Sequence, residues 1–168
     1  MTSLPLRNGI ITFAKNDQYE TPKYIWEMLA PFVDKNHTIY EPFYCSGLSK
    51  QYLNELGYKN VIHVDEDFYD NYDKYEYDII ISNPPYSNKK KVFDTLKIID
   101  KPFIMIVPVS TITKKFFRDK FKDDDITMLI PNKRLQFSKK GNTLSRCWFD
   151  TLFLCYKMNL KKQIIFLD

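Results

Sequence analysis

An Asn-Pro-Pro-Tyr run is the feature of this sequence that most directly predicts chemistry. Asn83-Pro84-Pro85-Tyr86 comes directly after Asp78-Ile-Ile-Ile-Ser82, a continuous apolar run that predicts a buried strand. The Asn83 side-chain oxygen and the Pro84 carbonyl can both accept hydrogen bonds, and the two prolines fix φ and remove two N–H donors. The loop therefore presents two acceptors in a stiff frame.

Such a loop suits the methylation of an exocyclic amine on an aromatic ring. That nitrogen is a poor nucleophile because its lone pair is delocalised into the ring, and two acceptors on its N–H bonds would turn the lone pair toward an electrophile. Tyr86 can stack on the ring and favour the positive charge that develops as the methyl group arrives. No strong general base is needed, which agrees with the presence of only His37 and His63. A base within a duplex would reach the loop by flipping out.

Alternating strand and helix patterns must position this loop. The 168 residues are expected to form one domain, with a three-layer α/β fold and a mostly parallel sheet. Ligands of such sheets bind beyond the carboxyl ends of the strands, so residues just after each strand should form the site. Strands are expected at 38–40, 61–64, 78–82, 103–107, 126–130 and 148–156, and helices at 22–32, 48–56, 89–99 and 113–121.

Three motifs together resemble those of the S-adenosylmethionine-dependent amino-methyltransferases, above all the N6-adenine DNA methyltransferases. The Asp78–Tyr86 run resembles their catalytic motif, and Tyr40–Gly47 resembles their first motif, an acidic residue followed by a glycine-rich turn. Asp17–Pro22 resembles their N-terminal motif, and the order of the three matches one permutation of the family. The resemblance covers residues 17–156, and the small size is similar to that of the compact enzymes of phages and large DNA viruses.

This resemblance implies a Rossmann-like class I methyltransferase sheet with one antiparallel strand, and S-adenosylmethionine as the cofactor. An acidic residue at the end of a strand is also a physically suitable partner for ribose hydroxyls. The implied cofactor contacts are Tyr19, Thr21 and Pro22 at the methionine moiety, Glu41 at its amino group, Pro42, Phe43 and Gly47 in the turn, Asp65 at the ribose, and Asp67 and Phe68 at the adenine.

Two departures from the family pattern carry expectations of their own. Cys45 stands where the family has glycine, so its side chain either obstructs a turn that needs positive φ or is tolerated there. Only the polar, tyrosine-rich segment Asp65–Tyr77 separates the second strand from the catalytic motif, which is too short for a further helix and strand. We therefore expect a sheet trimmed at one edge.

The basic residues gather in the second half of the chain. Residues 89–168 carry 18 basic and 8 acidic side chains, whereas residues 1–88 carry 7 and 13, which indicates a polyanionic partner or a solvated lysine-rich surface. Segment 133–147 is expected to be a basic loop that faces the substrate, unless Phe137 packs in the core. The predicted nucleic-acid contacts are Lys89, Lys90 and Lys91 at the mouth of the site, and Lys133, Arg134, Phe137 and Lys139 in this loop.

Several classes of protein are excluded or disfavoured by the sequence. Cys45, Cys147 and Cys155 form no C-x-x-C pair, which argues against a zinc site and a disulfide framework and for a reducing compartment. The apolar run Phe103–Val109 is too short for a membrane span, and segment 1–16, expected to be an N-terminal arm, does not resemble a secretory signal. We expect a cytoplasmic protein, or one of the host cytoplasm or nucleus if the source is viral.

Transfer of a methyl group from S-adenosylmethionine to N6 of adenine in DNA is the function that these features favour. The same chemistry on adenine in RNA or on a protein glutamine amide remains an alternative, because each substrate presents a planar NH₂ group. A catalytically inactive methyltransferase-fold subunit is a third possibility, motivated by Cys45, the trimmed sheet and the absence of a separate recognition domain. A homo- or hetero-oligomer with another methyltransferase subunit would suit that alternative.

Overall fold

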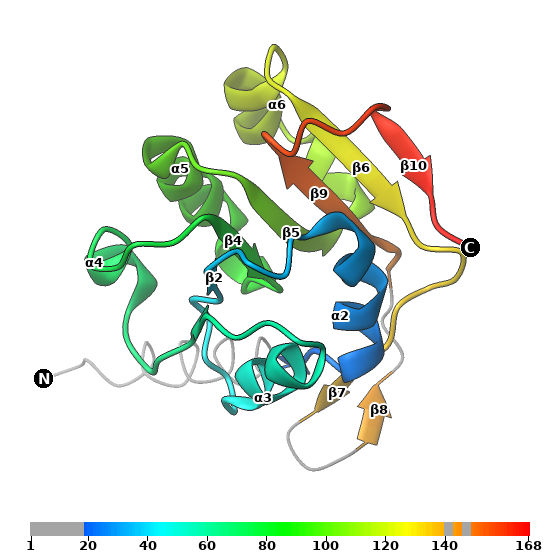
Figure 1. Cartoon of the computed structure of the whole chain (residues 1–168). Coiled ribbons are helices and arrows are strands. Elements are labelled where there is room, and N and C mark those ends of the chain that lie inside the picture. Colours follow the sequence, from blue (N-terminus) through cyan, green and yellow to red (C-terminus); the bar gives the residue numbers. More distant parts are fainter. Residues whose placement is uncertain (1–18, 140–142, 146–148) are drawn as a thin grey trace, which may run out of the picture.

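The centre of the molecule is a seven-stranded sheet in the order β10-β6-β9-β5-β4-β2-β3, seen in a computed structural model that describes residues 19–139, 143–145 and 149–168 (Figure 1). Strand β9 runs antiparallel to both of its neighbours, and the other six strands are parallel. The predicted α/β sheet with one antiparallel strand is therefore confirmed. The strands are β2 (Ile39–Tyr40), β3 (Val61–Ile62), β4 (Ile79–Ser82), β5 (Phe103–Pro108), β6 (Ile126–Ile130), β9 (Thr151–Tyr156) and β10 (Ile164–Phe166).

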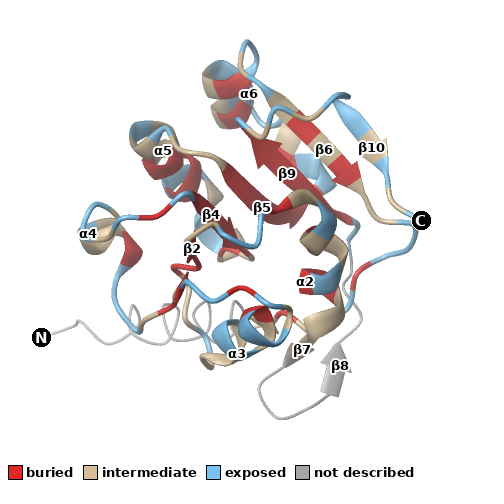
Figure 2. Cartoon of the chain, viewed as in Figure 1, coloured by how far each residue is buried: buried red, intermediate tan, exposed pale blue. Residues whose placement is uncertain are grey.

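Helices cover both faces of this sheet, because successive side chains of a buried strand point to opposite faces. Ile79 and Ile81 of β4 pack in one core cluster with Trp26, and Ile80 packs in the other with Phe93. Buried residues therefore fill the central strands (Figure 2). The first face carries α2 (Lys23–Leu29), η1 (Ala30–Phe32) and α3 (Leu48–Glu55), and the second carries α4 (Phe68–Asn71), α5 (Lys89–Ile99), η3 (Val109–Thr113) and α6 (Lys115–Phe121). The short helix η2 (Tyr86–Asn88) leads directly into α5.

The sheet is trimmed at the β3 edge, as expected. Between β3 and β4 the described chain contains the short helix α4 and no strand. Aromatic residues of this segment pack against the sheet instead, with the Tyr77 and Tyr75 rings 4.9 and 5.8 Å from that of Tyr40. The tyrosine-rich composition of the segment thus supplies apolar cover where a further strand and helix are absent.

Two features of the C-terminal half differ from the sequence prediction. The strand expected at 148–156 begins at Thr151 and is not the last one, since β10 adds a parallel strand beyond β6. Segment 133–147 is not simply a loop, because β7 (Phe137–Lys139) and β8 (Thr143–Ser145) pair antiparallel, and β7 also pairs with β1 (Tyr19–Glu20). Residues 1–18, 140–142 and 146–148, including Asp17, Cys147 and the predicted arm 1–16, lie outside the described residues.

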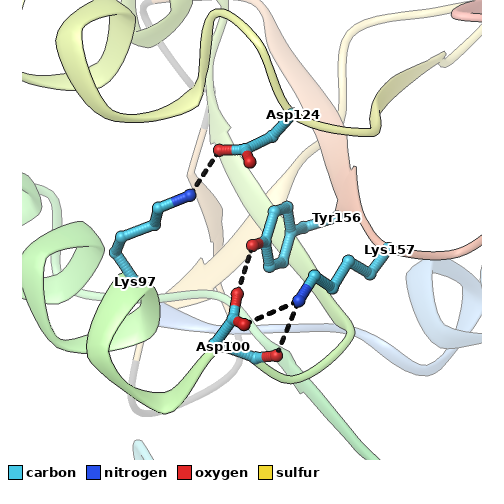
Figure 3. Close-up of polar contacts among 5 residues, drawn as sticks. All are labelled: Lys97, Asp100, Asp124, Tyr156 and Lys157. Carbon is cyan, nitrogen blue, oxygen red and sulfur yellow. Dashed lines mark hydrogen bonds and ion pairs between the residues drawn. The ribbon is translucent and has the colours of Figure 1, made fainter.

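A polar network (Figure 3) joins the amino end of β5 to the carboxyl end of its antiparallel neighbour β9. The catalytic motif lies at the opposite ends of the parallel strands, after the carboxyl end of β4. Asp100, in the left-handed conformation at φ 54°, accepts hydrogen bonds from the Tyr156 hydroxyl at 2.5 Å and from the Lys157 ammonium at 2.7 Å. Lys97 of α5 forms an ion pair with Asp124 at 2.5 Å. These contacts connect α5, β9 and the turn after α6.

Asp100→Ala should lower the free energy of unfolding by about 1 kcal/mol, since Tyr156 and Lys157 lose their acceptor and Ala is disfavoured at positive φ. The neighbouring Lys157 and Tyr156 hold the pKa of the Asp100 carboxyl below its usual value of 3.8. Its stabilising effect is therefore complete above that pH and is lost as the pH falls below it.

Urea denaturation of the wild type and Asp100→Ala at several pH values checks this prediction. The difference in stability should be largest near neutral pH and should shrink in acid. Asp123→Ala, which changes an exposed carboxylate in the turn after α6, is the control. An equal loss of stability in this control would show that the Asp100 network contributes nothing specific.

Candidate functional site

A cavity of about 650 Å³ lies beyond the carboxyl ends of β2, β3 and β4, where the fold predicts a ligand site. Its volume falls within the range of small-molecule sites. Four separate segments of the chain contribute to it: β1, the turn after β2, the loop after β3 and the catalytic motif after β4. The predicted site residues that line it are Tyr19, Thr21, Glu41, Pro42, Phe43, Asp65, Asp67, Phe68, Asn83 and Pro85.

Four predicted site residues lie next to the cavity without lining it. Pro22 is the N-cap of α2 rather than its first residue, and Gly47 is the N-cap of α3 at φ 83°. Pro84, within the catalytic motif, is buried. Tyr86 starts η2, and its hydroxyl contacts a cavity residue, Asn83. These four residues lie behind the residues that line the cavity and do not line it themselves.

The floor of the cavity is the buried carboxylate of Glu41. It accepts a 2.5 Å hydrogen bond from the Ser82 hydroxyl of β4 and a 3.0 Å hydrogen bond from the Phe43 amide. Burial raises the pKa of Glu41 above its usual range, and nearby His63 and these hydrogen bonds offset the shift only in part. A cationic group in the cavity would stabilise the charged carboxylate, so the floor is suited to an ammonium ligand.

His63 connects this floor to the loop after β3. Its Nδ1 lies 2.8 Å from the Glu41 carbonyl oxygen, to which it donates, and 3.9 Å from the Glu41 carboxylate. The Tyr44 ring stacks on the imidazole with ring centroids 4.9 Å apart. His63 is buried, and its Nε2 has no hydrogen-bond partner among the described residues. The arrangement is structural, since this imidazole does not line the cavity.

The turn after β2 has the backbone of a glycine-rich turn although it contains a cysteine. Cys45 adopts φ 49°, and Gly47 adopts φ 83° and donates its amide to the Tyr44 carbonyl at 2.8 Å. A Cβ atom on Gly47 would lie 2.7 Å from the Tyr44 hydroxyl oxygen. The Cys45 side chain is exposed and lines the cavity, and its backbone has the left-handed conformation that a glycine would adopt.

The rim of the cavity is acidic. Asp65 and Asp67 are exposed, and Asp67 also caps α4 by accepting the Tyr69 amide at 2.8 Å. Phe68 is buried and packs edge-on against Phe43, with ring centroids 5.3 Å apart. One oxygen of Asp67 is therefore occupied by the helix cap, and Asp65, in the loop after β3, faces solvent.

The catalytic motif forms the opposite wall. The Tyr86 hydroxyl donates to the Asn83 side-chain oxygen at 2.7 Å. The Phe149 ring meets Tyr86 edge-on, 5.6 Å away at 65°, and is 40% exposed. Phe149 was not predicted from the sequence. It lies just before β9, whose first residue pairs with Pro108 at the end of β5. Strand β5 lies beside β4, which leads into the catalytic motif. The position just before a central antiparallel strand was the available signal.

The lysines that follow the motif have different environments. Lys90 forms an ion pair with Asp94 at 2.7 Å, and the Lys91 ammonium lies 3.7 Å above the Tyr69 ring. Burial, followed by the charge of Lys114, lowers the pKa of Lys89. Two cations therefore lie close enough to repel each other beside the catalytic loop, and an anion there would relieve that repulsion.

The basic segment is placed differently from its prediction. Phe137 is 3% exposed and packs in the core, because it faces inward from β7, so it does not present a face to a substrate base. Arg134 forms an ion pair with Asp150 at 2.8 Å, and Lys133 is exposed. Lys139 belongs to β7 through its backbone, and Lys140 and Arg146 lie outside the described residues.

The described part of the chain contains no group of three or more metal-ligating side chains, and none of its helices has the length and apolar character of a membrane span. The predicted absence of a metal remains a prediction for the chain as a whole.

No protein-family model and no curated protein matches this chain. Among solved structures, a candidate methyltransferase from Thermoplasma acidophilum matches 79% of this chain and 72% of its own, with 12% identity and a TM-score of 0.42. TrmN from Thermus thermophilus also matches 79% of this chain, with 10% identity and a TM-score of 0.39, and the match spans only 47% of TrmN. Similarity at this level does not identify a family or a substrate.

Gly47→Ala should lower the free energy of unfolding by about 1 to 2 kcal/mol, because φ 83° is unfavourable for a residue with a Cβ atom and that atom would crowd Tyr44. Cys45→Gly is the matched change in the same turn. It should leave stability unchanged or raise it by up to about 1 kcal/mol. Equilibrium unfolding in urea measures both variants, and a neutral Gly47→Ala would contradict the strained geometry of this turn.

Proposed function

We propose that this protein is an S-adenosylmethionine-dependent methyltransferase that acts on N6 of adenine in a nucleic acid, with DNA as the favoured substrate. The observation that supports this most directly is that the catalytic motif and the three segments expected to hold the cofactor line one cavity. These segments are far apart in the sequence. Their convergence on one cavity supports the cofactor-binding and catalytic roles that the resemblance of the motifs implies.

The cavity fits the chemical groups of the proposed cofactor. Glu41 offers a buried carboxyl group whose charged form an ammonium group would stabilise, and Asp65, in the loop after β3, offers an exposed carboxylate for ribose hydroxyls. Cys45 adopts the left-handed conformation that a glycine would adopt, so the cysteine does not change the backbone shape of the turn. When bound, S-adenosylmethionine supplies a methyl group on a positively charged sulfur.

Asn83 and Tyr86 are the residues that would prepare the acceptor nitrogen. An amide oxygen has two lone pairs, so the Asn83 oxygen can accept from a substrate amino group while the Tyr86 hydroxyl holds its orientation. Tyr86 and Phe149 form an aromatic pair beside this oxygen, and Phe149 has the exposure that Phe137 does not have. A planar base could contact this pair while its amino group meets Asn83.

A nucleic acid is the substrate class favoured by the charges around the motif. Lys89 and Lys114 repel each other beside it, and Lys133 is exposed. A phosphate backbone would neutralise these cations and release their counterions. The preference for DNA over RNA rests on the resemblance of the motifs to those of the N6-adenine DNA methyltransferases.

Asn83→Ala should reduce methyl transfer by at least about 100-fold, because the acceptor that activates the amino group is lost. Cofactor affinity should stay within about threefold of wild type, since the Glu41 floor and the Asp65 rim are unchanged. Calorimetric titration with S-adenosylmethionine measures the affinity. Transfer of labelled methyl groups to single- and double-stranded DNA, RNA and protein, followed by digestion to nucleosides or amino acids, measures the activity and identifies the modified group.

Asn88→Ala is the control for this experiment, because Asn88 is exposed in η2 and its side chain makes no capping hydrogen bond. It should retain both binding and transfer. Equal loss of binding and transfer in Asn83→Ala would count against the role of Asn83. Absence of cofactor binding in the wild type would reject the enzyme and favour the inactive-subunit alternative. Methylated adenine in RNA, or methylated glutamine, would change the substrate and keep the chemistry.

Tyr86→Phe and Tyr86→Ala should separate orientation from stacking. Tyr86→Phe removes one hydrogen bond to Asn83 and should lower kcat/KM by about 3- to 10-fold. Tyr86→Ala also removes the ring and should lower it by a further factor of about 10 to 100. Steady-state kinetics on a DNA oligonucleotide measures both. Equal activities in the two variants would exclude a stacking role for this ring.

A further inference from the structure

Strand β10 forms one edge of the sheet (Figure 1), and β3, beside the cavity, forms the other. The Gln163 carbonyl accepts the Met128 amide at 2.8 Å, and the Leu167 amide donates to the Ile130 carbonyl at 2.8 Å, so the odd-numbered residues bond to β6. The amide and carbonyl groups of Ile164 and Phe166 therefore point away from β6. No strand lies beyond β10 among residues 19–139, 143–145 and 149–168.

The side chains of these two residues are apolar and exposed. Ile164 is 47% exposed and Phe166 is 76% exposed, and β10 is mostly coloured as exposed in Figure 2. Their partners in β6, Met128 and Ile130, are half-buried on the same face of the sheet. We call these four residues the edge patch. Natural sheets usually protect such an edge with charges, but here the charges flank the apolar residues.

The flanking charges make the strand complementary to itself. Lys162 lies two residues before Ile164, and Asp168 lies two residues after Phe166. If two copies of β10 run antiparallel about a twofold axis at Ile165, Ile164 of each copy faces Phe166 of the other, and Lys162 approaches Asp168. Moving the register by one pair would place Lys162 against Phe166, or Asp168 against Ile164. The register centred on Ile165 therefore pairs apolar with apolar and basic with acidic residues.

We propose that β10 is the interface of a homodimer, in which two copies of the chain pair through this strand and form one continuous sheet. In the register centred on Ile165, the outward groups of Ile164 and Phe166 face each other, and such a pair exchanges both of its hydrogen bonds. A twofold interface of this kind uses the same patch on both copies and closes on itself.

The dimer is compatible with the candidate site. Strand β10 and strand β3 are the two edges of the sheet, and the cavity lies by β2, β3 and β4. Pairing through β10 therefore leaves both cavities open. The Thr127 hydroxyl bonds to the Lys162 carbonyl at 3.0 Å and holds the chain at the entry to β10. This inference does not depend on the proposed methyl transfer.

Sedimentation equilibrium of the purified full chain tests the proposal. The wild type should show a mass that rises with concentration toward twice the 20.1 kDa of one chain. Concentrations up to about 0.5 mM are needed, because a contact between two short strands belongs to the weak class of interfaces. Phe166→Lys should reduce the dimer affinity by at least about 10-fold, because it places a charge in the edge patch. Ile98→Lys, which changes an equally exposed apolar residue of α5, should leave it unchanged.

Charge reversal tests the register. Lys162→Asp and Asp168→Lys should each weaken the dimer by about 3- to 10-fold, since both ends then carry like charges. The double variant should return to within about threefold of wild type. Circular dichroism and thermal unfolding verify that every variant is folded. A wild type that stays monomeric, a dimer indifferent to Phe166→Lys, or a double variant as weak as the single ones would overturn the proposal.

Discussion

The buried carboxylate of Glu41 is the constraint on which the rest of the site depends. A carboxylate without water is costly unless donors surround it, and its donors come from different segments: the Ser82 hydroxyl of β4 and the Phe43 amide of the turn after β2. His63, after β3, donates to the Glu41 backbone. Hydrogen bonds to the side chain and the backbone of one residue therefore join the carboxyl ends of three parallel strands. The cavity and the catalytic loop lie where these strand ends place them, because the segments that follow the strands line the cavity.

The stiffness of the catalytic loop complements this alignment. Pro84 is buried and Asn83 is half-buried, so the loop is anchored on the core side and presents its acceptor to the cavity. The Tyr86 hydroxyl then orients the Asn83 amide without contributing to the cavity surface. Two different kinds of constraint thus act on opposite walls, electrostatic satisfaction at Glu41 and restricted dihedral angles at the prolines.

Sequence reasoning predicted the elements whose patterns are long or local, and it failed where pairing is distant. Helix α5 begins and ends where periodicity placed it, and the catalytic motif follows a buried strand as expected. Strand β10 has only three residues, so its apolar pattern was too short to predict a strand. The pairing of Tyr19 with Lys139 joins segments 120 residues apart, which no local pattern records. Phe137, at the start of β7, lies in the core, and Phe149, which belongs to no motif, lies beside Tyr86.

The small β1-β7-β8 sheet connects the cavity to the basic segment. Strand β1 contributes Tyr19 to the cavity, and the same strand is bonded to the basic segment through β7. The backbone of Gln136, just before β7, is held by the Tyr24 hydroxyl of α2. The cavity and the basic segment are therefore joined by main-chain hydrogen bonds, and a molecule bound in the cavity would contact one of the strands that hold this segment.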